Sequence, residues 1–511
     1  MKLLLVDIGY DCEELNEPLG IEVLCTYVKN NISNIDVDIY YSNIDGLDYA
    51  KVLKGFAPDS VGVSTHINTL QRFDTFYTQY QDYCKINNKS VIVLVGGILG
   101  TYEFEYVLKY YRNTVCMIGE GEESLLYLLN ESNLLENLTY EDLIVSLHSH
   151  SCVNIAYIKD DRVFCKKRKC MESLQNITYP SEHKYLAAII ENKGLVRIES
   201  SRGCPWNKCS FCVLNWKYAG YAWRAYSLDK VISEIINVSL HGASVIYFTD
   251  EEFIAGDFER LNSFINRVRQ LKTENMINSK LEFVASTSVQ ALLGKYGMTK
   301  QQVVQCLRGL KEIGFRSFFL GIESGCDGQL LRFKKGCTIK ESEEAIKLLR
   351  NLSIESDIGY ILFDPLLTVE ELHESLKFIK RNGLSHHISR FAKRLRLVPY
   401  TEYSTFEGIE SNFYDYNWVE TIYKFQDCRI QKIYDCYSCW ENEHLTQTHT
   451  FQAEIRASES LEKNREVNMN KLIKIREDEF YVLSKLVEMA LKNQNFCFES
   501  NNVILENILL L

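Results

Sequence analysis

Three cysteines stand close together in the stretch Ser201-Arg202-Gly203-Cys204-Pro205-Trp206-Asn207-Lys208-Cys209-Ser210-Phe211-Cys212. Thiolates this close in sequence can converge on one soft metal centre. Three ligands for a cube of four irons leave one iron open, and an open iron can chelate the amino and carboxylate groups of a small molecule. Structural zinc is the alternative, but it needs a fourth ligand, and the nearest histidines, His183 and His241, lie some distance away in sequence.

A series of apolar runs surrounds this stretch, and helical segments separate them. Two of the helices begin with capping boxes, Thr338 with Glu341 and Thr368 with Glu371. Such a series of βα units curls into an open, partial barrel, and the cysteines then lie at the carboxyl end of its first strand, where βα barrels place their sites. The expected strands are Leu195–Glu199, Val245–Thr249, Glu282–Ala285, Ser317–Ile322, Ile358–Phe363 and Ile388–Leu397.

The cysteine stretch resembles that of the radical S-adenosylmethionine (SAM) enzymes. The resemblance rests on the Arg-Gly-Cys-Pro sequence, on the aromatic Phe211 and on the position after the first barrel strand. It implies that Cys204, Cys209 and Cys212 hold a [4Fe-4S] cluster, with SAM at the fourth iron and Phe211 near the adenine. The family usually has three residues between the first two cysteines, whereas four stand here; this departure bears on the loop geometry but removes no ligand.

Polar residues end other strands of the same barrel. In the family such residues contact the amino group, carboxylate or ribose of SAM, a role that the resemblance gives to Asp250, Glu323 and Ser324. Asp250 and Glu323 have an alternative role as caps of the following helices. Lys335 matches a lysine that is frequent in this segment of the family, or is a surface charge.

The first 130 or so residues alternate β-rich runs with amphipathic helices. Apolar strands that alternate with helices imply a parallel sheet covered on both faces, and such sheets bind ligands beyond the carboxyl ends of their strands. We therefore expect a doubly wound, Rossmann-like domain. Its expected strands are Leu3–Val6, Val37–Tyr41, Ser60–Ser64, Val91–Val95 and Val115–Ile118, and its helices include Ile21–Lys29, Leu70–Tyr83 and Glu103–Tyr110.

Glycine pairs that follow these strands let a backbone approach a bulky ligand. Together with their order ahead of the cysteine loop, they resemble the cobalamin-binding domain fused to one large radical SAM subclass. The histidine motif by which other cobalamin proteins reach cobalt is missing; only His66 occurs in the first 147 residues, and it could approach the lower face of cobalt or be a solvated loop residue. A domain that keeps the fold without the cofactor is a further alternative. The residues assigned to cofactor binding here are Ser64, Thr65, His66, Gly96, Gly97, Gly119 and Glu120.

Composition fits a cytoplasmic enzyme. The chain has 511 residues with a formal net charge of −11, which argues against general nucleic-acid binding. No apolar stretch is long enough for a membrane span or a signal peptide. The 17 cysteines are too few for a disulfide scaffold, and in a reducing compartment clustered cysteines bind metal or do chemistry.

Four parts are therefore expected along the chain. A basic run, Lys166–Lys169, lies in the second part and is interpreted as a solvated loop beside a possible hairpin. Helix is expected at Arg465–Leu491 in the last part. The parts are a cobalamin-binding-like Rossmann domain (1–135), a connector (136–194), a radical SAM partial (βα)6 TIM-type barrel (195–400) and a mostly helical C-terminal domain (401–511).

The remaining cysteines allow three hypotheses. Cys428, Cys436 and Cys439, near Trp440 and His444, are either a second metal site or buried free thiols. Alternatively, a cysteine near the substrate donates a hydrogen atom to a carbon radical. The candidates for this catalytic role are Cys326, Cys337 and Cys439.

The resemblance implies an enzyme that cleaves SAM reductively to a 5′-deoxyadenosyl radical and functionalises an unactivated carbon. With cobalamin bound, the expected outcome is C-methylation of a small molecule, a peptide or a natural-product intermediate. An electron donor such as flavodoxin or ferredoxin is the implied partner. The alternatives are radical rearrangement, cyclisation or epimerisation without methyl transfer, and a non-enzymatic metal-binding or redox-sensing protein.

Overall fold

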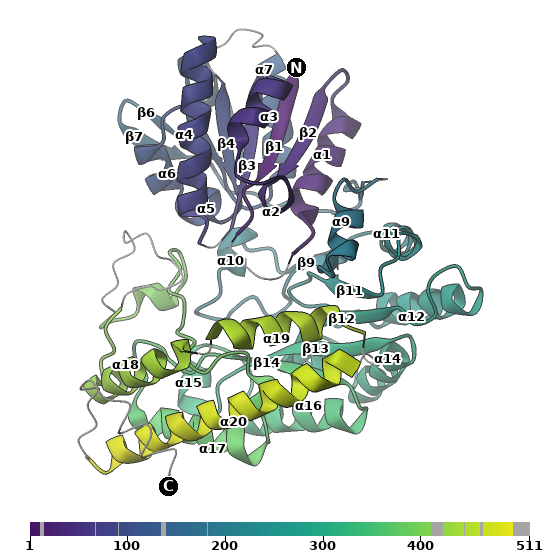
Figure 1. Cartoon of the computed structure of the whole chain (residues 1–511), viewed down its shortest axis with the longest axis vertical. Coiled ribbons are helices and arrows are strands. Elements are labelled where there is room, and N and C mark those ends of the chain that lie inside the picture. Colours follow the sequence, from purple (N-terminus) through teal and green to yellow (C-terminus); the bar gives the residue numbers. More distant parts are fainter. Residues whose placement is uncertain are drawn as a thin grey trace.

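A computed structural model places the chain in two stacked α/β layers with helices laid across the far end (Figure 1). It describes residues 1–10, 15–66, 68–89, 91–133, 139–180, 182–409, 423–443, 445–459 and 463–493. The expected order, a doubly wound domain, a partial barrel and C-terminal helices, is confirmed.

The first domain is built on a sheet of order β2-β1-β3-β4-β5-β6-β7. Its first five strands are parallel: β1 (Lys2–Asp7), β2 (Asp36–Tyr41), β3 (Ser60–Thr65), β4 (Ile92–Gly96) and β5 (Thr114–Met117). Alternate side chains of a strand face opposite layers, so Leu3 and Leu5 pack in one apolar core and Leu4 and Val6 in the other.

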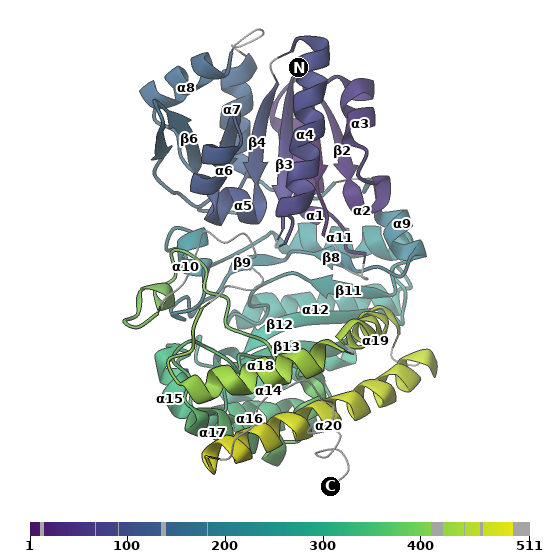
Figure 2. The ribbon, with the colours of Figure 1, turned by 60° about the vertical axis from the view of Figure 1, so that its left-hand side comes forward.

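Helices cover both faces of this sheet, as Figure 2 shows. They are α1 (Leu19–Asn31), α2 (Ser42–Asp45), α3 (Tyr49–Phe56), α4 (Leu70–Asn87), α5 (Gly97–Tyr102), α6 (Phe104–Tyr110), α7 (Glu122–Asn133) and α8 (Tyr140–Ser149).

The predicted connector is in part an extension of this domain. A hairpin of β6 (Ile155–Lys159) and β7 (Arg162–Cys165) is present and adds to β5 in antiparallel fashion. The sheet therefore continues well past the expected boundary at residue 135. Only the segment from Lys166 to α9 (Leu186–Glu191) links the two domains.

The second domain has a five-stranded parallel sheet of order β14-β13-β12-β11-β8. A two-stranded hairpin, β9 (Ser201–Gly203) with β10 (Trp223–Ala225), holds the two ends of the cysteine stretch. The sheet strands are β8 (Val196–Ile198), β11 (Val245–Phe248), β12 (Glu282–Ser288), β13 (Phe315–Glu323) and β14 (Glu355–Tyr360). Its helices are α10 (Leu214–Lys217), α11 (Leu228–Leu240), α12 (Phe258–Thr273), α13 (Val289–Leu292), α14 (Lys300–Glu312), α15 (Asp327–Arg332), α16 (Ile339–Asn351) and α17 (Val369–Arg381). Both predicted capping boxes are confirmed, at the starts of α16 and α17.

The prediction of a sixth barrel strand at Ile388–Leu397 is wrong. The segment forms two isolated bridges beside the sheet, Ile358 with Ile388 and Phe363 with Arg394. Its amides have another partner, because the buried Glu441 carboxylate accepts from the backbone N–H groups of Phe391 and Ala392 at 3.2 and 3.0 Å.

The C-terminal helices lie across the barrel (Figures 1 and 2). They are α18 (Cys428–Asn442), α19 (Leu445–Ala457) and α20 (Lys463–Leu491), and α20 packs against α17, α18 and α19. The helix expected at Arg465–Leu491 is thereby confirmed.

Candidate active site

The three cysteines of the loop lie together between β9 and β10. All are free, half-buried thiols, and the amide of Cys212 donates to the carbonyl of Cys209 at 3.1 Å. Burial raises the pKa of Cys209 to about 12 and that of Cys212 to about 11, and each is raised further by the neighbouring cysteines. The thiols are therefore close enough to share one centre.

Their spacing fits a cluster rather than a single ion. Zinc bonds of about 2.3 Å would bring tetrahedral sulfur ligands within about 4 Å of one another. Among the described residues, the three sulfurs do not form a group of donors within 4.8 Å. A cube of irons holds its thiolates further apart, so the donor set fits a [4Fe-4S] cluster.

A buried lysine lies beside these thiols. Lys335 donates to the Glu323 carboxylate at 3.1 Å and lowers the pKa of Cys209 and Cys212 against the effect of burial. Glu323 ends β13 with φ of +70°, a conformation that costs a non-glycine residue energy. Of the two hypotheses for Lys335, the surface charge is wrong. Glu323 is half-buried at the cysteine loop, and its contact with SAM stays a prediction.

Asp250 and Ser324 are buried and hold the backbone near the site. Asp250 is 2% exposed and accepts from the backbone N–H and the hydroxyl of Ser200, at 2.8 and 2.6 Å. Ser324 is fully buried and accepts from the amide of Cys326 at 3.0 Å at the start of α15. The contact of either residue with SAM stays a prediction.

The neighbour of Asp250 reaches the cysteine loop. Glu251 accepts from the amide of Gly203 at 2.9 Å and from the Tyr218 hydroxyl at 2.7 Å. This role could not be assigned from the sequence, where Asp250, Glu251 and Glu252 are three adjacent acids of equal weight. Phe211 is half-buried and meets Phe333 edge-on, with ring centroids 5.1 Å apart.

The candidate hydrogen donors differ in their surroundings. Cys326 is 4% exposed, which closes it off from a substrate. Cys439 is exposed on α18, and among the described residues it forms no metal-type group with Cys428 and Cys436; His444 lies outside them. Cys337 is half-buried and shares the charge of Lys335 with Cys209, so it is the one of the three beside the cysteine loop.

The glycine pair after β4 serves the fold. Gly97 has φ of +71°, and a Cβ there would lie 2.1 Å from the carbonyl oxygen of Thr65. Thr65 is buried; its hydroxyl donates to the carbonyl of Gly96 at 2.6 Å and accepts from the amide of Leu99. Gly96, Gly97 and Thr65 therefore form a tight turn, and their contact with a ligand stays a prediction.

A cleft separates the two domains. It lies at the carboxyl ends of the neighbouring strands β1 and β3, from which the chain continues to β2 on one side and to β4 on the other, the switch point at which doubly wound sheets bind ligands. A cavity of about 290 Å³ lies between the first domain and the base of the cysteine loop. Lining residues include Ser64, His66, Gly119 and Glu120 on one side and Arg197, Glu199, Arg202 and Lys217 on the other.

His66 lines this cleft from the end of β3. Its Nε2 lies 2.7 Å from the Asp7 carboxylate, and the Tyr10 ring packs against it at 5.4 Å. The switch point of the sheet is the place where a domain of this type would hold cobalamin. His66 would lie near it, and ligation of cobalt by His66 stays a prediction.

Glu120 has a different partner from the one predicted. Arg202 stands two residues before Cys204. Its guanidinium contacts three carboxylates, those of Glu120 at 3.0 Å, Glu122 at 2.7 Å and Glu199 at 2.9 Å. Arg224 also contacts Glu120 at 3.0 Å. Although burial opposes it, these two arginines lower the pKa of Glu120 to about 2. We call Glu120, Glu122, Glu199, Arg202 and Arg224 the domain-bridging ion cluster.

Comparisons with known proteins agree with this architecture. Residues 198–379 match the radical SAM superfamily, and residues 1–129 match the B12 binding domain. The chain therefore carries a radical SAM domain preceded by a B12-binding domain. It is a radical SAM enzyme, and these domains imply a [4Fe-4S] cluster, SAM and cobalamin as its cofactors. That Cys204, Cys209 and Cys212 hold the cluster in place of structural zinc stays a prediction.

Two curated relatives illustrate its range of similarity. It is 25% identical over 343 residues to the 4′-phospho-dehydrooxetanocin synthase of Priestia megaterium, covering 63% of this chain and 43% of that protein. It is 24% identical over 381 residues to an uncharacterized methyltransferase of Pyrococcus horikoshii, covering 72% and 74%.

Two solved structures share the fold. The cobalamin-dependent SAM radical enzyme OxsB, with aqua-cobalamin and SAM bound, superposes with a TM-score of 0.79 at 17% identity, over 99% of this chain and 78% of that one. The radical SAM methyltransferase TsrM from Kitasatospora setae, with cobalamin and [4Fe-4S] cluster bound, gives 0.59 at 17% identity, over 81% and 77%. None of the described helices has the length and apolar character that crossing a bilayer requires.

Proposed function

We propose that this enzyme transfers a methyl group to an unactivated carbon of a small-molecule or peptide substrate bound in the cleft between its two domains. The observation that carries the proposal is that Arg202 and Lys217, at the base of the cysteine loop, line the same cleft as the switch point of the B12-binding domain. The switch point of the B12-binding domain forms one wall, and Arg202, two residues before Cys204, is fixed to Glu120 of the other wall. Similarity to a protein named as a methyltransferase supports methyl transfer.

The chain's residues position the cofactors and exclude water. Cys204, Cys209 and Cys212 would ligate the cluster, and Lys335 places a positive charge beside them. Glu251 and the domain-bridging ion cluster fix both ends of the loop that would hold the cluster, so that its cysteines have a set geometry.

When bound, the cluster with SAM supplies a 5′-deoxyadenosyl radical and the cobalamin supplies the methyl group. Overall, R–H, two SAM molecules and two electrons give R–CH3, methionine, 5′-deoxyadenosine and S-adenosylhomocysteine, so that one C–H bond is replaced by C–CH3. We propose that a cytoplasmic donor such as flavodoxin or ferredoxin supplies both electrons.

A second function, radical rearrangement, cyclisation or epimerisation without methyl transfer, is also supported. Relatives include proteins named as a synthase and as a cyclase; the anaerobic magnesium-protoporphyrin IX monomethyl ester cyclase of Rubrivivax gelatinosus is 27% identical over 380 residues, covering 71% of this chain and 62% of that protein. Cys337, beside the cysteine loop, could then return a hydrogen atom to a carbon radical.

The test begins with anaerobic purification and reconstitution with iron, sulfide and cobalamin. SAM and a strong reductant are added, and 5′-deoxyadenosine and S-adenosylhomocysteine are measured by mass spectrometry. We expect both products from the wild type and no 5′-deoxyadenosine from Cys212→Ala, because that variant loses a cluster ligand. Cys165→Ala, which removes an exposed cysteine on β7, serves as the matched control and should behave as the wild type.

The two products separate the two functions. Formation of S-adenosylhomocysteine that depends on added cobalamin supports methyl transfer. Formation of 5′-deoxyadenosine without S-adenosylhomocysteine supports rearrangement, cyclisation or epimerisation. Undiminished SAM cleavage by Cys212→Ala would show that the cluster is held elsewhere.

A further inference from the structure

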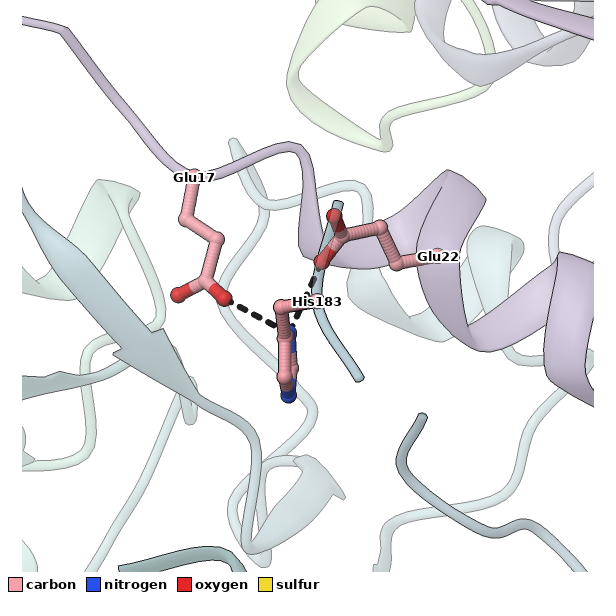
Figure 3. Close-up of side chains that lie close together, drawn as sticks. All are labelled: Glu17, Glu22 and His183. Carbon is pink, nitrogen blue, oxygen red and sulfur yellow. Dashed lines mark hydrogen bonds and ion pairs between the residues drawn. The ribbon is translucent and has the colours of Figure 1, made fainter. Parts of the chain in front are cut away.

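A buried histidine, His183, lies beside the carboxylates of Glu17 and Glu22 (Figure 3), and a third carboxylate, that of Glu234, lies on the other side of its ring, where the two domains meet. Its Nδ1 is 2.9 Å from Glu17 Oε1 and 2.8 Å from Glu22 Oε2, and its Nε2 is 2.8 Å from Glu234 Oε1. All four side chains are at most 3% exposed. Neither the cluster nor the cobalamin cleft accounts for this group around His183.

Protons alone leave part of the group unsatisfied. A ring nitrogen carries at most one proton, so Nδ1 can donate to Glu17 or to Glu22 but not fully to both. Glu17 Oε1 is accordingly a buried oxygen without a hydrogen-bond donor in the described part of the chain. An unsatisfied buried carboxylate oxygen is costly, which points to a missing cation between the two carboxylates.

The charges give the same result. Even with a protonated ring, three ionised carboxylates leave two negative charges in excess. The backbone hydrogen bonds to these carboxylates come from neutral groups: the Arg197 amide donates to Glu17 at 2.7 Å, and the Tyr185 amide donates to Glu22 at 3.4 Å. Buried charge without compensation is rarely tolerated in proteins.

We propose that Glu17, Glu22 and Nδ1 of His183 bind a divalent transition-metal ion, with Zn²⁺ as the first candidate. Their donor atoms lie within 4.8 Å of one another, and one imidazole with carboxylates is a ligand set that zinc accepts. Two carboxylates balance the charge of the ion. Glu234 then accepts from Nε2–H of the neutral ring, the carboxylate–histidine–metal arrangement that orients a ligating histidine.

The position of the ligands gives the ion a structural role. Glu17 precedes α1 and Glu22 lies in its first turn, both in the first domain, whereas His183 belongs to the linking segment and Glu234 to α11 of the barrel domain. The ion would join all three parts beside the cleft, since Glu17 also lines it. This inference does not depend on the proposed methyl transfer.

The test measures metal directly. The full chain is reconstituted with its iron–sulfur cluster, dialysed against a chelator and then against Zn²⁺ with a final buffer exchange. Zinc and iron are counted by plasma mass spectrometry, and zinc ligands are identified by X-ray absorption. We expect one zinc ion per chain with nitrogen and oxygen ligands, lost in His183→Gln and in the isosteric Glu22→Gln.

Two controls assign the ion to this site. His241→Gln changes an exposed histidine at the end of α11 and should keep the zinc. Cys212→Ala should lose iron but keep the zinc, which separates the two metal sites. Added Zn²⁺ should also raise the melting temperature of the wild type and leave that of Glu22→Gln unchanged, a readout that survives if His183→Gln fails to fold.

The rival is a protonated ring with no metal. Although burial lowers it, hydrogen bonds to Glu17, Glu22 and Glu234 raise the pKa of His183 to about 12 in that case. A folded wild type that retains no zinc, zinc that persists in both His183→Gln and Glu22→Gln, or sulfur in the zinc spectrum would each overturn the proposal.

Discussion

The turn at Gly97 can be tested by adding one methyl group. Because its Cβ would lie 2.1 Å from the Thr65 carbonyl, we expect Gly97→Ala to lower the free energy of unfolding by about 1–3 kcal/mol. Urea unfolding measures this. Gly20→Ala is the control, since its Cβ would meet no atom within 4 Å. A Gly97→Ala variant that is fully stable yet loses cobalamin would return Gly97 to the ligand site.

Asp250 makes stability depend on pH in an unusual direction. Burial raises its pKa to about 7, although Ser200 and Ser201 lower it in part. An unfolded aspartate titrates near 3.9, so between about pH 4 and 7 the folded state holds the extra proton, and this contribution to stability falls as pH rises.

Asp250→Asn removes that titration. As pH rises from 5 to 8, we expect the wild type to lose about 1–3 kcal/mol of its free energy of unfolding relative to the variant. Urea unfolding at both pH values measures the change. Asp229→Asn, at an exposed carboxylate of α11, should show no such change. Parallel wild-type and Asp250→Asn curves would contradict the assigned pKa.

At the scale of elements, patterns within a short stretch of sequence predict the features that are formed within that stretch. The parallel strands were found because buried strands are apolar runs, and the cysteine loop because its spacing lies within one loop. The sequence predicts a strand at Ile388–Leu397 as well, but the amides of Phe391 and Ala392 donate to Glu441, some fifty residues further on. No local signal reports such a partner, and the same holds for Lys335 beside the thiols.

Helix α20 offers an element-scale test of the C-terminal packing. Leu483 is fully buried in it, whereas Val467 on the same helix is 43% exposed. Leu483→Ala should lower the free energy of unfolding by about 2–5 kcal/mol because it leaves a cavity. Val467→Ala should cost far less. Equal losses in thermal or urea unfolding would mean that α20 does not pack on the barrel as described.

At the scale of the molecule, the domain-bridging ion cluster couples the two domains. Arg202→Met leaves Glu120, Glu122 and Glu199 without their shared cation, and we expect a loss of about 3–5 kcal/mol. Calorimetry should show the domains melting separately in the variant and together in the wild type. Arg269→Met breaks an exposed pair with Glu312 and should cost less than about 1 kcal/mol. An unchanged calorimetric profile for Arg202→Met would show that the domains are coupled by other contacts.

The order of the domains was predictable, but their contact was not. Arg202 and Glu120 each belong to a motif that suggests a ligand, and only the fold brings the two motifs to one place. The sequence therefore suggests cobalamin as the partner of Glu120, whereas in the fold Glu120 binds Arg202 of the other motif.

The ion cluster also limits how this protein can be recombined. A chimera that grafts another protein's first domain onto this barrel would bury Arg202 and Arg224 against a surface lacking Glu120 and Glu122. Such a graft would fold poorly even if both halves kept their cofactor sites. The two carboxylates would have to travel with the arginines, so the transferable unit is the pair of domains together.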